Sequence, residues 1–444
     1  MELLISAPDL DEVRAHIFAG TTEGCAVLYT RRVVRPGRAD RHLVAQVIIP
    51  SDNEYLVRTP LRATLSPSFV AIVTKTASSR HFGLVFVHSH RAPAPARFSQ
   101  EDDRGEAHLR AFLMRRAFAG TSMALLLGQD RMDARILGTL ERVRVIAVGA
   151  KRTVHVDDTV PFLEDSDEYE RQVRAFGAEA QAHLRNLAVG IVGLGGTGSL
   201  IAQLLAHLGV RSFLLVDPDQ IERSNLNRVA NATPEDVGTD KVDVAARYIR
   251  QVNSTAVVDT LTEDVVRSRI ARRLGDLDFI FGCTDSHGSR SVIQQVAYQY
   301  LVPCIDMGAI IVMRGKELSH VHGRVQLLAP GLPCLACSGL LDATEVRRDL
   351  MTPLERSSDP YIVGAREPAP AVMSLNATVA SLAINMLLAT VAGLPDTARH
   401  LLYSALGARL RRLGTTALPN CYICSPLNGV LARGDDAPLM ARRD

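Results

Sequence analysis

Four glycines form a turn that could bind phosphate groups. They are Gly193, Gly195, Gly196 and Gly198. The run G-L-G-G-T-G follows an apolar strand predicted at 187–192 and precedes a helix predicted at 197–208. A backbone without side chains can approach phosphates closely, and the phosphates then lie at the helix N-terminus. The next predicted strand ends at Asp217, where an acid can bind a ribose hydroxyl. These features fit any nucleotide-binding enzyme, including an NAD-dependent dehydrogenase.

A set of polar and charged residues further along the chain favours chemistry on ATP. It comprises Asn225, Arg228, Lys241 and Asp285. The two cations can neutralise a triphosphate, and the acid, which ends the run Cys-Thr-Asp, can hold Mg²⁺. A dehydrogenase has no need for such a set. The sequence therefore predicts an adenylating enzyme.

The order and spacing of these residues resemble the ThiF/MoeB/ubiquitin-activating family from about residue 169 to the end. The family run D-x-D-x(4)-S-N-L-x-R corresponds to 217–228, G-x-x-K to 238–241 and C-T-D to 283–285. The resemblance implies a ribose-binding Asp217, a Mg²⁺-binding Asp285, and phosphate contacts from Asn225, Arg228 and Lys241. It also implies the activity, which is ATP-dependent adenylation of the C-terminal glycine carboxylate of a ubiquitin-like protein.

A second motif lies just before the predicted sheet. Tyr169-Glu-Arg171-Gln172 is similar to the family's Y-x-R-Q, whose arginine reaches the nucleotide of the partner subunit. Arg171 is therefore a candidate catalytic residue that acts across a homodimer interface. The alternative is that Arg171 and Arg228 are solvated surface charges.

Two C-x-x-C pairs indicate a structural zinc site. The cysteines are Cys334, Cys337, Cys421 and Cys424. Each pair can present two thiolates on one turn, and two such turns complete a tetrahedral Zn²⁺ site. A redox C-x-x-C would be expected alone, at the start of a helix. The family resemblance has the same pairs in the same order.

The chain departs from many activating enzymes of the family, which carry a nucleophilic cysteine after the first zinc pair. No cysteine lies between Ser338 and Asn420, so no thioester can form on that stretch. Direct transfer of the adenylate to an acceptor is the preferred interpretation. An oxyester on Ser357 or Ser358 is the alternative, although serine is a poor nucleophile without a paired base.

The first part of the chain holds a different set of polar residues. His88, His90, Ser99 and Asp102 resemble the JAMM (MPN/JAB) metallopeptidase motif H-x-H-x(7)-S-x(2)-D, and Glu23 begins a segment similar to its E-x-x-G-x-L. The resemblance implies zinc on the two histidines and the aspartate, with a fourth position for water. Glutamate outside the metal shell can take that water's proton, and a serine can stabilise an oxyanion. A zinc peptidase or isopeptidase is therefore a second predicted activity.

This motif also departs from its family. Eight residues rather than seven separate His90 from Ser99, Arg91 stands at the usual proline, and Ala26 stands at the glycine. The extra residue falls in a proline-rich loop that could absorb it. Ser89 is expected only to separate the two histidines. The alternative is a degenerate JAMM domain that serves as a docking platform.

Two regions must position these residues. The segment 1–150 alternates short apolar runs with turns and one helix near 103–118, which predicts a mixed α/β JAMM/MPN-like domain. The segment 151–168 suits a linker. From 169 to 430, strands alternate with helices, so we expect a Rossmann-like, doubly wound and mainly parallel sheet of the ThiF type. A polar helix is expected over 169–184, and one of the strands is expected over 303–307. The segment 431–444 is expected to be a polar tail.

Composition excludes several classes of protein. The formal net charge of +2 gives no nucleic-acid footprint, and acids stand where a signal peptide would carry basic residues. The longest apolar segment, 371–394, contains several serines, threonines and asparagines and is expected to be a buried helix rather than a membrane span. Seven cysteines with two C-x-x-C pairs favour metal binding in a reducing compartment, so a cytoplasmic protein is expected.

Three functions are consistent with the sequence. The first is a ubiquitin-like modification system of bacterial type, with a ubiquitin-like partner and a conjugating enzyme. The second is activation of a sulfur-carrier protein in cofactor or cysteine biosynthesis. The third is a scaffold that binds a ubiquitin-like tail without chemistry, which the intact set of charged residues disfavours.

Overall fold

The computed structural model describes residues 1–90, 97–129, 131–155, 167–352, 355, 370–395 and 397–443. The chain divides into two compact units. The first comprises Met1–Thr159 with Leu431–Ala437, and the second comprises Val160–Val430 with Pro438–Asp444.

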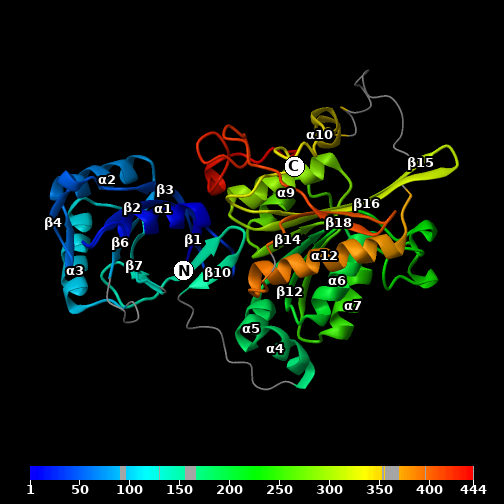
Figure 1. Cartoon of the computed structure of the whole chain (residues 1–444), viewed down its shortest axis with the longest axis horizontal. Coiled ribbons are helices and arrows are strands. Elements are labelled where there is room, and N and C mark those ends of the chain that lie inside the picture. Colours follow the sequence, from blue (N-terminus) through cyan, green and yellow to red (C-terminus); the bar gives the residue numbers. More distant parts are fainter. Residues whose placement is uncertain are drawn as a thin grey trace. The chain divides into compact units, whose positions relative to one another are not determined.

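The first unit is built on an eight-stranded mixed sheet (Figure 1). In sheet order, its strands are β10 (Arg152–His155), β9 (Arg144–Val148), β1 (Glu2–Ser6), β3 (Arg41–Ile48), β2 (Cys25–Val33), β6 (Gly83–Ser89), β7 (Ser122–Leu127) and β8 (Met132–Ile136). A separate hairpin joins β4 (Tyr55–Thr59) to β5 (Arg62–Leu65). The parallel pairs are β1 with β3, β1 with β9, and β6 with β7.

Helices pack on both faces of this first sheet. They are α1 (Ala7–Ile17), α2 (Pro67–Ser79) and α3 (Gln100–Arg115). The sheet has one hydrophobic core on each face. Alternate residues of β2 belong to different cores, because successive side chains of a strand point to opposite faces. Leu28 packs in the core that contains α1, whereas Val27 and Tyr29 pack with α2 and α3.

The second unit is built on another eight-stranded sheet, which is parallel over its first five strands and antiparallel over the rest. In sheet order, these strands are β13 (Val257–Leu261), β12 (Ser212–Val216), β11 (Ala188–Val192), β14 (Phe279–Gly282), β15 (Cys304–Arg314), β16 (Glu317–Leu328), β17 (His400–Ser404) and β18 (Arg409–Arg412). The expected parallel sheet is thus extended by a long meander, and β15 runs well past the predicted end at residue 307.

Helices cover both faces of the second sheet (Figure 1). The described helices of this unit are α4 (Glu170–Phe176), α5 (Ala178–Asn186), α6 (Gly196–His207), α7 (Lys241–Val252), α8 (Ser268–Leu274), α9 (His287–Gln299), α10 (Ala343–Leu350) and α12 (Met373–Val391). Of these, α4 packs on α5, and α10 packs on α9. Helix α12 packs against α6 and the sheet. Among the described residues it is the one helix long and apolar enough to cross a membrane, but 67% of its apolar window is buried inside the protein.

Three other local expectations differ from the structure. Residues 152–155 of the expected linker form β10, which pairs with β9 in the first sheet. The polar helix predicted over 169–184 is broken at Gly177, whose φ of 89° ends α4 and begins α5. The C-terminal segment is not a single tail. Asp436 pairs with Arg31 of the first unit at 2.5 Å, and the Met440 amide donates to Gln295 of the second unit at 2.7 Å.

Candidate functional site

The nucleotide motifs meet at the carboxyl ends of three adjacent parallel strands. Val192 of β11 is in register with Val216 of β12 on one side and with Gly282 of β14 on the other. The residues that follow these strands are the glycine turn, Asp217, and the run Cys283–Asp285. In open α/β sheets, ligands bind in the crevice outside the carboxyl ends of the strands. The tertiary structure therefore gathers the three predicted motifs.

The glycine turn is tightly packed. Gly193 has a φ of 89°, and a Cβ there would lie 2.8 Å from the carbonyl oxygen of Cys283. A Cβ on Gly198 would lie 1.8 Å from the Gly193 oxygen, and one on Gly196 would lie 2.1 Å from Nδ2 of Asn376. A Cβ on Gly195 would meet no atom within 4 Å. Three glycines thus permit close packing, and the backbone at the fourth borders open space that a phosphate could enter.

Asn376 was not among the predicted site residues. It lies on α12, is only 5% exposed, and touches the turn from a helix almost two hundred residues away in sequence. The sequence did not single it out, because Asn376 is one of several polar residues in this mainly apolar helix.

Asp217 is held in a fixed position between two loops. Its carboxylate accepts hydrogen bonds from the backbone amides of Leu194 at 2.5 Å and Asp219 at 2.9 Å. Burial raises its pKa, while Lys241 and the two amides act in the opposite direction. The side chain therefore links the glycine turn to the end of β12.

Lys241 begins α7 and is paired with an acid of the same motif. Its Nζ lies 2.7 Å from Asp219 Oδ2 and 4.0 Å from Asp217 Oδ1. The Lys241 side chain is only 12% exposed, whereas that of Asp219 is 64% exposed. Asp219 thus holds the ammonium beside the strand end, a role that sequence reasoning did not assign.

Asn225 and Arg228 lie on the loop between β12 and α7 and make local contacts. The Oδ1 of Asn225 accepts from the Glu222 amide at 3.2 Å, and the Arg228 guanidinium donates to the Ser224 carbonyl at 2.5 Å. The Ser199 hydroxyl of α6 accepts from the Ala230 amide at 2.9 Å, which ties this loop to the first turn of α6. Within the described part of the chain, no hydrogen bond or ion pair joins the side chains of Arg228, Lys241 and Asp285.

Asp285 is exposed and lies three residues beyond the end of β14. A side chain of α9 holds the loop that carries Asp285, because Arg290 Nε donates to the Thr284 carbonyl at 3.0 Å. The same guanidinium lies 3.5 Å from Asp306, which is 2% exposed and also pairs with Arg324. Sequence reasoning missed this Arg–Asp–Arg group. The signal was an acid inside an apolar strand, since a buried carboxylate requires a cationic partner.

The Tyr169–Gln172 motif separates into packing residues and an exposed arginine. Tyr169 is 5% exposed and packs against Gly209, and Gln172 donates to the His207 carbonyl at 2.8 Å. Both contacts hold α4 against the end of α6. Arg171 points to solvent, with no recorded partner among the described residues.

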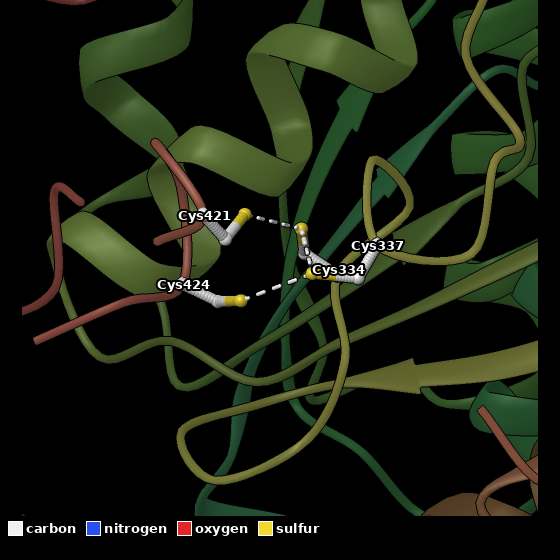
Figure 2. A group of neighbouring side chains, drawn as sticks. All are labelled: Cys334, Cys337, Cys421 and Cys424. Carbon is white, nitrogen blue, oxygen red and sulfur yellow. Dashed lines mark hydrogen bonds between the residues drawn. The ribbon is translucent and has the colours of Figure 1, made fainter. Parts of the chain in front are cut away.

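The four predicted cysteines form one cluster (Figure 2). The Sγ atoms of Cys334 and Cys337 lie 3.7 Å apart, and the cross pairs Cys334–Cys421 and Cys337–Cys424 are each separated by 3.5 Å. A tetrahedral Zn²⁺ with Zn–S bonds of about 2.3 Å places its sulfurs about 3.8 Å apart. The cluster therefore fits zinc.

The predicted JAMM ligands also converge. His88 Nε2 and His90 Nε2 lie 3.0 Å and 3.3 Å from the two carboxylate oxygens of Asp102, and the three ligand atoms lie within 4.8 Å of one another. His88 Nε2 is buried without an aligned hydrogen-bond partner, which fits a ligand atom directed at a shared centre. Burial raises the pKa of Asp102, but the close approach of the two histidines outweighs burial and lowers the pKa. The hydrogen bond with Asp102 raises the pKa of His90.

Neighbouring residues position this second set. Glu23 is 9% exposed and close enough for its charge to help raise the pKa of His90. Ser89 is more than a spacer, because its hydroxyl accepts from the Gly24 amide at 3.2 Å and so ties the Glu23 segment to β6. Ser99 caps α3 and donates to Asp102 at 2.7 Å. Its hydroxyl therefore orients a ligand, rather than pointing freely toward an oxyanion.

Comparison with known proteins assigns the second unit. The chain is 27% identical over 227 residues to Ubiquitin-like modifier-activating enzyme 5 of Oryza sativa subsp. japonica, which covers 47% of this chain and 50% of that protein. It is 31% identical over 173 residues to the SAMP-activating enzyme E1 of Haloferax volcanii, covering 38% and 61%. It is 27% identical over 258 residues to the Molybdopterin-synthase adenylyltransferase of Escherichia coli (strain K12), covering 58% and 95%. The chain thus spans about half to three-fifths of the length of the first two relatives.

Among solved structures, the Microcin C7 biosynthetic enzyme MccB in complex with N-formylated MccA covers 90% of this chain at 14% identity, with a TM-score of 0.49. A likeness of that degree supports no statement about function. The ThiF family model matches residues 169–423. This range leaves the first unit without a family assignment, so its JAMM resemblance stays a prediction. Because the matched range covers more than half of the chain, the protein belongs to the ThiF family.

Proposed function

We propose that this protein uses ATP to adenylate the C-terminal carboxylate of a ubiquitin-like or sulfur-carrier protein. The observation that carries the proposal is the meeting of the Gly193–Gly198 turn, the Asp217–Lys241 pair and Asp285 at adjacent strand ends. Relatives named as ubiquitin-like modifier-activating and molybdopterin-synthase adenylyltransferase enzymes support this reaction class.

Each group has a role in this reaction. The open backbone at Gly195 admits the phosphates, and Asp217 is positioned to bind a ribose hydroxyl. Lys241 can exchange its ion pair with the exposed Asp219 for a phosphate oxygen. Mg²⁺, when bound, neutralises phosphate charge, and Asp285 is the residue that would hold it. The carboxylate of the partner protein attacks the α-phosphorus, and pyrophosphate leaves.

The fate of the adenylate forms part of the proposal. We infer that an acceptor nucleophile takes the acyl group directly from the adenylate, with AMP as the leaving group and with or without a conjugating enzyme, because no cysteine lies between Ser338 and Asn420. The alternative oxyester residues, Ser357 and Ser358, lie outside the described residues. A ubiquitin-like and a sulfur-carrier partner would differ after adenylation, since only the latter accepts sulfur.

ATP–pyrophosphate exchange with a small protein that ends in glycine tests the proposal. We expect exchange by the wild-type chain and a loss of about 100-fold or more in Asp285→Ala, because the metal loses its carboxylate. Asp243→Ala, an acid in the first turn of α7, is a matched control that should retain exchange. A wild-type chain that binds the partner without any exchange would support the scaffold instead.

A second candidate function resides in the first unit. The convergence of His88, His90 and Asp102 beside Glu23 supports a zinc peptidase that cleaves after a ubiquitin-like tail. Zinc, when bound, would lower the pKa of a coordinated water. The protein's part is to hold the metal with three ligands and to accept the water's proton at Glu23.

Metal analysis and hydrolysis test this second function together. We expect two zinc ions per chain and cleavage of a ubiquitin-like protein that carries a C-terminal extension. A chelator should stop cleavage before it unfolds the cysteine-ligated unit, because a three-ligand site holds zinc less tightly. A chain with one zinc ion and no cleavage would favour the docking platform.

A further inference from the structure

A pocket beside the His88–His90–Asp102 set carries a further inference. Its volume is about 380 Å³, and its lining is dominated by arginine. The lining residues are Arg97, Phe98, Asp133, Arg135, Leu140 and Arg142. All of them belong to the first unit.

The pocket and the candidate metal site share a wall. The ring of Phe98 lies 6.0 Å from that of His88, and the carbonyl of Arg97 accepts a hydrogen bond from His90. On its other side, Phe98 supports the guanidinium of Arg135, 3.9 Å from the ring centroid. One residue pair, 97–98, thus contacts both ligating histidines and lines the pocket.

The three arginines have different surroundings. Arg135 is fixed, because its side chain is 8% exposed and pairs with Asp103 at 2.7 Å and Glu106 at 2.8 Å. Arg142 is 48% exposed and pairs with Asp133 at 3.0 Å. Arg97 is exposed, and no ion pair is recorded for it in the described part of the chain.

The lining carries three positive charges and one negative charge. Arginine forks bind carboxylates through paired, charge-assisted hydrogen bonds. Phe98 and the exposed Leu140 offer apolar surface for the methylenes that precede such a carboxylate. An extended chain advances about 3.3–3.6 Å per residue, so a side chain in this pocket belongs to a residue near the scissile bond.

We propose that this pocket is a specificity site for an acidic side chain of the polypeptide cleaved at His88–His90–Asp102. The proposal rests on the second candidate function. Arg97 and Arg142 are its recognition residues, and Arg135 is its rigid base.

Paired peptides test the site on the zinc-loaded full chain. Each quenched fluorescent peptide has a central Gly-Gly bond. The peptides come in pairs that differ at a single position, which lies within three residues of that bond on either side and carries Glu in one peptide and Gln in the other. We expect one Glu peptide to be cleaved about tenfold faster than its Gln partner, which corresponds to one charged hydrogen-bonded contact. The double variant R97Q/R142Q should lose this preference and keep the rate on the Gln peptide. The control variant R115Q removes a positive charge at the C-terminal end of α3 and should retain the preference for the Glu peptide.

Binding provides a second readout that does not need turnover. Fluorescence anisotropy of the same peptides with zinc-loaded Glu23→Gln should show tighter binding of the Glu peptide, again lost in R97Q/R142Q. If no peptide is cleaved but this binding preference appears, the peptidase function fails and the pocket stands. Equal binding of Glu and Gln peptides, or a cleavage preference that survives R97Q/R142Q, overturns the pocket.

Discussion

The two candidate metal sites of this chain differ in the number of their side chains, in burial and in their neighbours. The cysteine set has four thiols, and Cys334, Cys421 and Cys424 are all less than 9% exposed. The His–His–Asp set has three ligands whose side chains are 14–26% exposed. An acid, Glu23, lies near the second set. Tyr298 and Tyr422 lie near the cysteines, and the Tyr298 hydroxyl donates to the Leu332 carbonyl at 2.8 Å.

This difference shows what each arrangement can do. Four thiolates fill the coordination shell of zinc, so the cysteine cluster can stabilise the fold but leaves no position for substrate. Three ligands leave one position for water, and a nearby carboxylate can accept the water's proton. The hydrogen bond with the neighbouring thiol of Cys334 lowers the pKa of Cys424, which favours the thiolate form that zinc binds.

The largest effect that would test this comparison is expected from Cys421→Ser. The variant should lose one zinc ion per chain and unfold at least about 10 °C lower, because structural zinc contributes several kcal/mol or more of folding free energy. Metal analysis and thermal denaturation measure both quantities. The control Tyr422→Phe changes a residue between Cys421 and Cys424 without removing a thiol, and its zinc content and thermal stability should match those of the wild type. Unchanged zinc content in Cys421→Ser would show that the cluster is not a zinc site.

The next effect separates a proton acceptor from a ligand. Glu23→Gln should keep both zinc ions and lose hydrolysis by about 100-fold or more, because general-base catalysis contributes factors of this size. His88→Ala should lose one zinc ion along with the hydrolysis. If both variants retain zinc and cleavage, the first unit has no catalytic metal site.

A third prediction concerns the second unit as a homodimer. Arg171→Ala and Lys241→Ala should each abolish exchange, because each removes a cation from the phosphates. If Arg171 acts across the interface, mixing them equally gives half heterodimers with one intact site each, or about one quarter of the wild-type activity. Exchange assays after co-refolding measure this recovery. No recovery, or a monomer by light scattering, would place Arg171 in its own site or outside the mechanism.

The smallest effect is expected from Ser89→Ala. Loss of the hydrogen bond to the Gly24 amide should lower the free energy of unfolding by about 1 kcal/mol. Zinc content should stay at the wild-type level, since Ser89 is not a ligand, while hydrolysis falls several-fold as Glu23 becomes less well placed. Ser68→Ala, an exposed serine on α2, serves as the control. A loss of zinc in Ser89→Ala would instead indicate that Ser89 shapes the ligand set itself.

The local motifs were well predicted because strand, turn and helix are encoded within a short stretch of chain. The turn at Gly193 requires a positive φ and close packing, which glycine alone tolerates without strain. The predicted strands and helices around it appear within one or two residues of their expected ends. The break at Gly177 was missed, because the same helical periodicity continues on both sides of it.

The sequence by itself determined the residues of the glycine turn, of the Asp217–Lys241 and Cys283–Asp285 motifs and of the two candidate ligand sets, and the strand–turn–helix units that carry them. Only the tertiary structure decided which distant residues support them. Asn376 reaches the glycine turn from α12, Ser89 holds the Glu23 segment, and Arg290 with Asp306 fixes the Asp285 loop. These contacts join residues far apart in the chain, and they form only when strand order and helix packing are set by burial of the shared core. No short pattern in the sequence predicts the order of the strands in the sheet or the packing of the helices on it.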